Sequence, residues 1–443
     1  MHTIDQALGV MMELFEPVEI EEVAILDALG RCLAVPMHAR HASPAVDVSA
    51  MDGYAVRLAD FGDRHLSVSL PLEGESRTGG PMPAPLAGGT TMRILTGAAV
   101  PEGADAVVPQ ELVTLTESNG GAPRSIVFAE RPKPFANIRR RGEEVRVGEV
   151  IVPAGHPIGP GEISILASQH IGRVPVRRRP TVAIVSTGDE LIDLADTPTP
   201  GKIVNSNAYG LASAVVEAGA RPWMLPTVPD DKEAIAATLR TALRADVIVT
   251  SGGVSVGDHD YVHEALQAVG VKRILWKVAI KPGKPIAFGV SDRRDGEAGT
   301  RRTVVVGLPG NPISALVTFA IFVRPGLHRM MGDRRPMPAL IKARLGAACR
   351  HSVGRVEFVR VRLSAATELD DDGTHPLTAE PLVQQGSGAH ASMVGCDAFA
   401  ILSSARGDHQ AGEIVRVLLL DPGSLRADRC WMGDYPPTRL IPT

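Results

Sequence analysis

The sequence predicts a multidomain α/β protein that combines a doubly wound α/β domain with a β-rich insert, a mixed N-terminal scaffold and a small C-terminal β-barrel. The first observation is length, because 443 residues exceed what one hydrophobic core usually organises and indicate two to four domains. The second is the alternation of strand and helix patterns over residues 177–332. The third is the predominance of short strands and turns in residues 42–141 and 333–420.

The N-terminal scaffold is expected to consist of residues 1–41 and 142–176, with residues 42–141 inserted between them. Apolar residues keep helical spacing through residues 1–40, where Gly30 and Pro36 end the pattern, so this stretch is predicted to be helical. A further helix is expected from about Gly161 to Gln169. Within the insert, Asp52-Gly53 lies between apolar flanks and predicts a hairpin or a tight turn.

The α/β domain is expected to begin after the basic run at 177–179 and to extend to residue 332. Strands are predicted at 181–187, 222–228, 246–250, 274–279, 285–290 and 302–306. Helices are predicted at 207–217, after Asp230 or Asp231, from 258 to 270, and from 312 to about 331. Such alternation favours a parallel sheet that binds ligands at the carboxyl ends of its strands.

Three glycine-containing turns follow strands of this predicted sheet. They are Ser186-Thr-Gly-Asp-Glu190, Ser251-Gly-Gly253 and Gly307-Leu-Pro-Gly-Asn-Pro312. A strand, a glycine turn and a helix present backbone N–H groups to a phosphate, so we expect the three turns to line one anion-binding crevice. Their spacing matches neither the Rossmann nor the Walker A motif, which disfavours NAD and ATP-kinase chemistry.

Acidic residues accompany two of these turns, with Asp189-Glu190 after the first and Asp258 and Asp260 after the second. Oxygen ligands of this kind suit Mg²⁺, which keeps some water and phosphate oxygens around it. The alternative is helix capping, in which an acid is stabilised by the helix dipole. Capping accounts for one acid at each turn and accounts less well for two.

The segment Lys281-Pro-Gly-Lys-Pro285 predicts a type II turn, with proline and glycine at its central positions. The ends of such a turn lie within ~7 Å of each other, so both lysines can bind one anion. The alternative is an ordinary solvated turn. Outside the sheet, Asp52, Thr96 and the charged run at 139–144 favour, on spacing alone, turn chemistry and a solvated face.

Composition excludes several classes of function. A formal net charge of −4 and an aromatic content of 4% give no case for nucleic acid as a partner. The N-terminus has no signal-peptide pattern, and no apolar run approaches the ~18 residues of a membrane span. The four cysteines lie far apart without a Cys-x-x-Cys pair, which is typical of reduced thiols. We therefore expect a cytoplasmic protein that binds no membrane.

Eight motifs, taken together, resemble those of the MoeA family of molybdopterin molybdenumtransferases, to which the E domain of gephyrin belongs. They run in order from the N-terminal part to about residue 420: Ser49–Ala55, Leu95–Ala98, Gly103–Val108, Asn137–Glu143, Ser186–Glu190, Ser251–Gly257, Lys281–Pro285 and Gly307–Pro312. In this sequence Glu144 stands where many family members carry aspartate, and Val48 stands where a polar residue is common. The tail at 421–443 is not covered by the resemblance.

The resemblance implies an elongated homodimer in which the molybdopterin-binding α/β domain of one subunit shares a cleft with the insert of the other. It implies that molybdate enters adenylylated molybdopterin, with Mg²⁺-dependent cleavage of the phosphoanhydride and release of AMP, as the last step of molybdenum cofactor synthesis. A molybdopterin adenylyltransferase and molybdoenzymes or their chaperones are the implied partners.

The resemblance also implies a set of site residues. Asp189, Glu190 and Asp260 would hold the cation, with Glu190 and Asp260 counted among the catalytic residues. Lys281 and Lys284 would neutralise phosphate charge, and Asp52, Thr96 and Glu144 would come from the partner subunit. The implied cofactor-binding residues are Thr187, Gly188, Ser251, Gly252, Gly253, Ser255, Pro309, Asn311 and Ser387.

Two other functions remain open at this point. A molybdopterin adenylyltransferase shares the α/β domain and its Ser-Gly-Gly turn, but the motifs at 49–55 and 137–144 disfavour it. A non-catalytic scaffold would bind cofactor or a partner peptide, as gephyrin also does, and the acids at 189, 190 and 260 favour catalysis instead.

Overall fold

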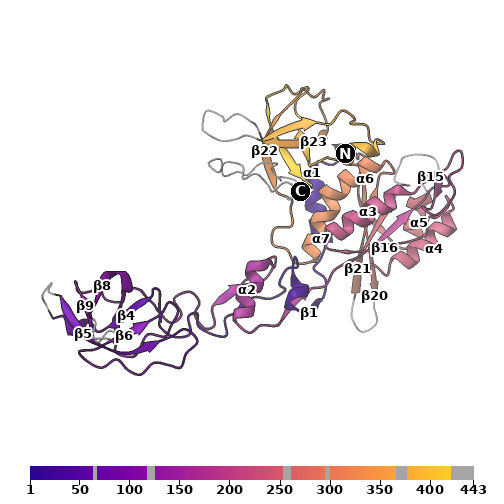
Figure 1. Cartoon of the computed structure of the whole chain (residues 1–443). Coiled ribbons are helices and arrows are strands. Elements are labelled where there is room, and N and C mark those ends of the chain that lie inside the picture. The colour runs from indigo at the N-terminus through magenta and orange to yellow at the C-terminus, as the bar shows by residue number, and fades with distance from the viewer. Residues whose placement is uncertain (63–66, 117–124, 253–260, 295–299, 366–376, 421–443) are drawn as a thin grey trace.

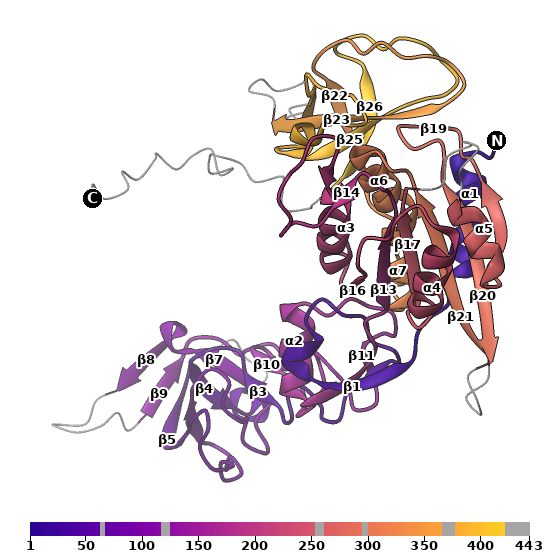
Figure 2. The same cartoon turned by 90° about the vertical axis from the view of Figure 1, so that its right-hand side faces the viewer.

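The chain is elongated, with the β-rich insert at one end and the α/β domain and the barrel at the other (Figures 1 and 2). The scaffold lies between these two ends (Figure 1). The computed structural model describes residues 1–62, 67–116, 125–252, 261–294, 300–365 and 377–420. Within these residues, no helix combines the length and apolar character needed to cross a bilayer.

The α/β domain is built on a six-stranded sheet of order β16-β13-β17-β21-β20-β18. The strands are β13 Thr181–Ser186, β16 Arg221–Met224, β17 Val247–Ser251, β18 Lys272–Trp276, β20 Ala287–Arg294 and β21 Thr300–Leu308. The first four in spatial order are parallel, whereas β20 pairs antiparallel with both β21 and β18. The expectation of a wholly parallel sheet is therefore wrong at this edge, because the link from β20 to β21 is too short for a crossover.

Helices cover both faces of this sheet. One face packs against α3 (Ser206–Glu217), α6 (Pro312–Thr318), the π-helix η5 (Phe319–Val323) and α7 (Arg324–Met330). The other face packs against α4 (Lys232–Ala242) and α5 (Tyr261–Ala268). Side chains of β17 alternate between the two cores, with Val247 and Val249 on one side and Ile248 on the other. The predicted helix from 312 to about 331 is confirmed as α6, η5 and α7 in direct succession.

The N-terminal residues divide between two parts of the molecule. Helix α1 (Ile4–Leu14) is fixed by a capping box of Thr3 and Gln6 and packs in the core of the α/β domain. The next segment is strand β1 (Ile20–Ala24), which pairs with β12 (Arg173–Arg177), followed by the short 3₁₀ helix η1 (Ile25–Ala28). The prediction of helix through residues 1–40 is therefore wrong beyond Leu14, because long-range strand pairing overrides the local periodicity.

The scaffold is completed by β2 (Met37–His38), β11 (Val150–Val152) and α2 (Pro160–Ser168), which confirms the helix predicted near 161–169. In the insert, β3 (Val48–Ser49) pairs with β10 (Ile138–Arg139). The main sheet has the order β7-β4-β6-β5-β9-β8. Its strands are β4 Gly53–Val56, β5 Val68–Ser76, β6 Thr91–Ile94, β7 Ala106–Pro109, β8 Val113–Thr116 and β9 Ser125–Phe128, with the 3₁₀ helices η2 (Leu58–Phe61) and η3 (Gln110–Leu112) beside them.

The Asp52-Gly53 turn does not form the predicted hairpin. It connects β3 to β4, and these two strands pair with β10 and with β6 and β7 respectively. Gly53 lies so close to β7 that a Cβ atom would come within 2.1 Å of the Val108 carbonyl oxygen. The glycine therefore serves close strand packing at this position.

The C-terminal part is the predicted small β-barrel. Its strands are β22 Leu340–Leu345, β23 Val356–Ala365, β24 Leu377–Pro381, β25 Ala398–Leu402 and β26 Ile414–Leu419, with the 3₁₀ helix η6 (His390–Met393) in one connection. The pairing β23-β24-β22-β26-β25-β23 closes the ring. Strand β19 (Ile280–Lys281) of the α/β domain adds in parallel to β23, so the two domains share a strand contact. The small strands β14 (Leu191–Ile192) and β15 (Ile203–Val204) pair beside the α/β sheet.

Candidate active site

A crevice of about 610 Å³ lies at the carboxyl ends of β13, β17 and β21. All three predicted glycine turns contribute to it, and the barrel loop that precedes η6 closes one side. Its lining includes Thr187, Glu190, Ser251, Gly252, Pro285, Pro309, Gly310, Asn311, Pro312, Gly388 and His390. The structure thus brings together six of the predicted residues of the α/β domain: Thr187, Glu190, Ser251, Gly252, Pro309 and Asn311.

Two asparagines before and within α3 hold the strand-end turns in register. Asn207 donates from Nδ2 to Ser251 Oγ at 2.9 Å and to the Gly310 carbonyl at 2.6 Å, so one amide joins two of the turns. Asn205 caps α3 by accepting from Ala208 N at 3.2 Å. The sequence interpretation missed both residues, although an asparagine just before a predicted helix is itself a capping signal.

The first turn needs glycine for two reasons. Gly188 has a φ of 153°, and a Cβ atom there would lie 2.6 Å from a Glu190 carboxylate oxygen. Gly252, in the second turn, has a φ of 94°. Both backbones adopt conformations that residues with a side chain rarely adopt. The carboxylate of Glu190 can therefore fold back over its own turn into the crevice.

Acidic groups gather at the end of β13. Asp189 Oδ1 accepts from the backbone N–H of Asp230 at 3.1 Å, and the Asp189 carbonyl accepts from Lys202 Nζ. Burial raises the pKa of Asp230, and the charges of Asp189 and Glu190 raise it further, against one backbone hydrogen bond that lowers it. These carboxylates therefore repel one another, which is the electrostatic setting that a cation relieves.

The acids do not form a ready-made metal centre on their own. Within the described part of the chain, no group of three His, Cys, Asp or Glu side chains is arranged to hold a metal ion. The predicted ligand Asp260 and the predicted cofactor-binding residues Gly253 and Ser255 lie outside the described residues, as does Asp258.

The lysine turn has a different geometry from the one predicted. The Lys281–Pro282 peptide bond is cis, which a type II turn does not contain, so that turn type is wrong. Lys281 Nζ lies 2.9 Å from Glu357 Oε1 in the barrel, and Lys284 has no carboxylate partner among the residues that the structure describes. Pro285, at the end of the turn, lines the crevice. Among the described residues the two lysines share no carboxylate partner, and the end of their turn reaches the crevice.

The barrel loop at 384–388 is fastened to the third glycine turn. Asn311 Nδ2 donates to Ser387 Oγ at 3.1 Å, and Ile313 N donates to the Ser387 carbonyl at 3.1 Å. Beneath this loop Arg360 is fully buried and donates from Nη2 to the carbonyls of Gln384 and Gly386. Its Nε and Nη1 have no partner within the described residues. The sequence interpretation missed Arg360, because its position inside a strand pattern gave no sign of its surroundings.

The predicted residues Asp52 and Thr96 of the insert contact each other, and Glu144, just after the insert, makes separate contacts. Asp52 Oδ1 accepts from the backbone N–H and from the hydroxyl of Thr96, both at 2.7 Å. These two hydrogen bonds lower the pKa of Asp52. Glu144 Oε2 accepts from Ser43 Oγ at 3.1 Å and pairs with Arg139 at 3.3 Å. Asp52 directly precedes β4 and Thr96 follows β6, and these strands lie in the insert, at the opposite end of the chain from the α/β domain (Figure 1).

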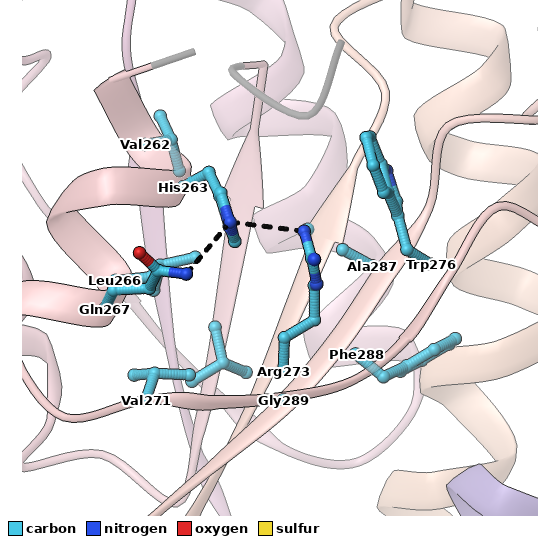
Figure 3. A pocket seen from close by; sticks show the side chains of 12 residues that line it. Val262, His263, Leu266, Gln267, Val271, Arg273, Trp276, Ala287, Phe288 and Gly289 are labelled. Carbon is cyan, nitrogen blue, oxygen red and sulfur yellow. Dashed lines mark hydrogen bonds between the residues drawn. The ribbon is translucent and has the colours of Figure 1, made fainter. Parts of the chain in front are cut away.

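A second, smaller hollow of about 60 Å³ lies between α5 and the strands β18 and β20 (Figure 3). Its floor includes Ala287 and Gly289, and His263 Nε2 lies 3.2 Å from both Gln267 Nε2 and Arg273 Nη1 (Figure 3). This volume holds about two water molecules. Neither its size nor its lining matches the predicted chemistry, which belongs to the larger crevice.

Family models match the N-terminal part, the α/β domain and the C-terminal barrel separately. Three family models match consecutive parts: the MoeA N-terminal region (domain I and II) at residues 2–169, the probable molybdopterin binding domain at 183–329, and the MoeA C-terminal region (domain IV) at 342–420. The molybdopterin molybdenumtransferase of Haemophilus influenzae is 35% identical over 420 residues, which cover 94% of this chain and 98% of that protein. The chain belongs to the MoeA family.

Other MoeA relatives agree over the same length. The molybdopterin molybdenumtransferase of Bacillus subtilis is 32% identical over 94% of both chains. A crystal structure of a molybdopterin biosynthesis MoeA protein from Pyrococcus horikoshii has 30% identity and a TM-score of 0.76, and covers 94% of this chain and 98% of that one. The multidomain MoeA fold predicted from the sequence is thereby confirmed.

Proposed function

We propose that this MoeA protein is a molybdopterin molybdenumtransferase that inserts molybdate into adenylylated molybdopterin, hydrolyses the phosphoanhydride and releases AMP. The observation that carries the proposal is the crevice in which the three glycine turns and Glu190 meet, with Asp189 and Asp230 beside Glu190. Relatives that match this chain over nearly its whole length carry the name molybdopterin molybdenumtransferase. The site offers what cleavage of a phosphoanhydride needs: donors for phosphate oxygens, and carboxylates for a cation.

The acids support a place for Mg²⁺. Asp189 and Glu190 follow one strand, and after burial their charges raise the pKa of Asp230, so the three carboxylates repel one another. Asp189, Glu190 and Asp260 would hold the cation, which suits the hard oxygen ligands that Mg²⁺ takes. When bound, Mg²⁺ would polarise the phosphoanhydride and neutralise charge on the departing phosphate.

The remaining groups would bind and orient the substrate. Gly252 lines the crevice at the end of β17, and its backbone N–H donates to the Leu308 carbonyl at 3.3 Å, which fixes the second turn against the third. Thr187, Ser251, Pro309 and Asn311 line the same space, and Ser387 accepts a hydrogen bond from Asn311. Asn207 keeps the second and third turns at a fixed separation. Lys281 and Lys284 would add positive charge beside Pro285. A phosphoanhydride held in this way has a fixed orientation for hydrolysis.

Residues of the insert would reach the crevice from a second subunit. Asp52 and Thr96 are bonded to each other on an exposed surface that is remote from the crevice of the same chain (Figure 1). A homodimer in which each insert faces the partner's α/β domain would unite Asp52, Thr96 and Glu144 with the crevice. The proposal also includes a cytoplasmic location and contact with a molybdopterin adenylyltransferase and with molybdoenzymes or their chaperones.

The direct test mixes the purified protein with adenylylated molybdopterin, molybdate and Mg²⁺ and measures AMP. We expect AMP release that requires both molybdate and Mg²⁺. Glu190→Gln should lower kcat by about 100-fold or more, since it removes a charged group from the reacting centre. Glu233→Gln, an exposed acid on α4 outside the crevice, is the matched control and should leave kcat unchanged. AMP release that is independent of molybdate would contradict the proposal.

A further inference from the structure

A buried carboxylate of the barrel, Glu357, contacts the first lysine of the lysine turn. Glu357 Oε1 lies 2.9 Å from Lys281 Nζ, and the Glu357 side chain is 10% exposed while that of Lys281 is 46% exposed. The lysine therefore stands partly in solvent while its partner is held inside the protein. This contact joins two domains, because Glu357 begins β23 of the barrel and Lys281 ends β19 of the α/β domain.

The second oxygen of Glu357 is also engaged. His351 Nδ1 lies 2.8 Å from Glu357 Oε2, and His351 Nε2 lies 3.0 Å from the Ser403 carbonyl oxygen. The His351 side chain is only 1% exposed, and its backbone N–H donates to Asp408 Oδ1 at 2.7 Å. With both oxygens bonded, the carboxylate has a fixed position and a fixed orientation toward Lys281.

Backbone contacts fix the rest of the turn. Lys281 stands opposite Glu357 in the parallel pairing of β19 with β23, and Val356 N donates to the Ala279 carbonyl at 3.0 Å. At the other end, a Cβ atom on Gly283 would lie 2.4 Å from Thr318 Cγ2, so the turn rests directly on α6. Pro285 then enters the lining of the crevice.

We propose that Glu357 is a positioning residue that fixes the Lys281 ammonium in the turn whose Pro285 lines the crevice, so that it can bind a phosphate oxygen of the substrate. This inference rests on the proposed function, in which Lys281 neutralises phosphate charge. A lysine side chain is flexible, and ordering it costs conformational entropy when an anion binds. A fixed carboxylate that already orders Lys281 before binding reduces this cost. His351 acts on the same lysine through Glu357, and the barrel thereby takes part in a site whose other groups lie mainly in the α/β domain.

A simple counter-ion would give the opposite result. If Glu357 only competed with the anion for Lys281, removing its charge would strengthen anion binding. If it positions Lys281, removing its charge weakens anion binding because the ammonium is no longer fixed. The two cases differ in sign, so one affinity measurement separates them.

The test uses the full-length protein and inorganic pyrophosphate as the probe, with affinity measured by calorimetry. We expect Glu357→Gln to weaken pyrophosphate binding about fivefold and to lower kcat/KM for AMP release by a similar factor, which is the scale of one charge-assisted contact. Glu413→Gln is the matched control: this barrel glutamate also pairs with a histidine and an arginine, His409 and Arg406, and does not contact Lys281. It should leave both values unchanged.

A double variant tests whether the effect passes through the lysine. In a Lys281→Ala background, Glu357→Gln should cause no further loss of pyrophosphate affinity. Glu357→Asp keeps the charge and should retain part of the affinity. If Glu357→Gln lowers the melting temperature, Glu357→Asp replaces it. The pyrophosphate affinity of Glu357→Asp is then compared in the wild-type background and in the Lys281→Ala background.

Unchanged or tighter pyrophosphate binding in folded Glu357→Gln, or an equal loss with and without Lys281, would overturn the positioning role. Because the binding measurement does not require turnover, it decides this inference separately from the proposed function. Normal molybdate-dependent AMP release in all Glu357 variants would reject the inference and leave the proposed function standing.

Discussion

The two hydrogen bonds from Thr96 to Asp52 lower the pKa of the Asp52 carboxyl group. Backbone and hydroxyl donors both stabilise the ionised form, so the pKa lies below its ordinary value of 3.8. The stabilisation that these contacts provide is therefore present above pH 3.8 and is lost as the pH falls through the lowered folded value. At neutral pH Asp52 is an anion held at a defined place.

Replacing Thr96 tests this account. Thr96→Val removes the hydroxyl donor and keeps the backbone donor, so the pKa of Asp52 should rise part of the way toward its ordinary value. An NMR titration of the Asp52 carboxyl group measures the change. Thr116→Val, which removes a hydroxyl elsewhere in the insert, should leave that titration unchanged. An unshifted Asp52 in Thr96→Val would show that the backbone donor alone sets the pKa.

Gly188 offers a second test at the residue scale. An alanine here would place Cβ 2.6 Å from a Glu190 carboxylate oxygen, so Gly188→Ala should displace Glu190 and lower AMP release by about tenfold or more. Gly201→Ala is the control, because Gly201 also has a positive φ, of 82°, but has open space around its Cβ position. Activity assays with thermal unfolding of both variants separate displacement of Glu190 from backbone strain. Equal losses of activity would argue against displacement.

At the scale of elements, sequence periodicity correctly predicted those helices and strands whose formation depends mainly on neighbouring residues. The buried strand at Val247–Ser251 and the helix at Ser206–Glu217 have clear periodicity and stop signals, and the structure has both. Strand β1 could not be predicted in this way, because its extended form depends on pairing with β12, far along the chain. The antiparallel edge of the sheet and the strand contact between β19 and β23 also depend on distant partners.

The same division applies to the candidate site. Turn residues such as Gly188 and Gly252 carry their own signal in the sequence, since glycine meets a backbone requirement there. Asn207, Arg360 and Glu357 act through what they contact in three dimensions, and a single sequence shows no such contacts. Sequence reasoning therefore found the loops of the crevice and missed the groups that hold those loops in place.

The start of the α/β sheet is held by an ion pair with a measurable contribution to stability. Arg178 contacts both carboxylate oxygens of Asp246, at 2.6 and 2.7 Å, and the Asp246 side chain is 5% exposed. Arg178→Ala removes the positive charge that faces this buried carboxylate and leaves it contacts such as the one with the Thr181 backbone N–H, so the free energy of unfolding should fall by about 3–5 kcal/mol. Denaturant unfolding, followed by a signal from the α/β domain, measures the loss.

A surface pair provides the comparison for Arg178. Arg173 and Glu22 are 3.8 Å apart, with side chains 62% and 66% exposed. Arg173→Ala should therefore change the free energy of unfolding by no more than about 0.5 kcal/mol. A loss of that small size in Arg178→Ala as well would mean that Asp246 is satisfied by its remaining contact with the Thr181 backbone N–H.

At the scale of the whole molecule, the elongated shape separates two groups of residues that the proposed chemistry needs together. The scaffold stands between the insert, with Asp52 and Thr96, and the α/β domain, with the crevice (Figure 2). Paired strands such as β1 with β12 and β2 with β11 connect its segments and give it a defined form. A symmetric dimer resolves the separation, because a two-fold axis can place each insert against the other subunit's crevice.

Mixed dimers test this arrangement directly. Asp52→Ala and Glu190→Gln subunits, each inactive alone, should regain activity when they are mixed and allowed to exchange. A dimer with one subunit of each kind has one cleft with both defects and one cleft with none. Random exchange of equal amounts should therefore restore about a quarter of the wild-type AMP release.

The result depends on exchange, which size-exclusion chromatography of differently tagged subunits verifies. If each cleft were built within one subunit, every cleft in the mixed dimer would carry one defect, and activity would not return. Exchange without recovery would therefore reject the shared cleft, even if the protein is a dimer. Recovery near a quarter would assign Asp52 and Glu190 to opposite subunits of one site, which no contact within a single chain can do.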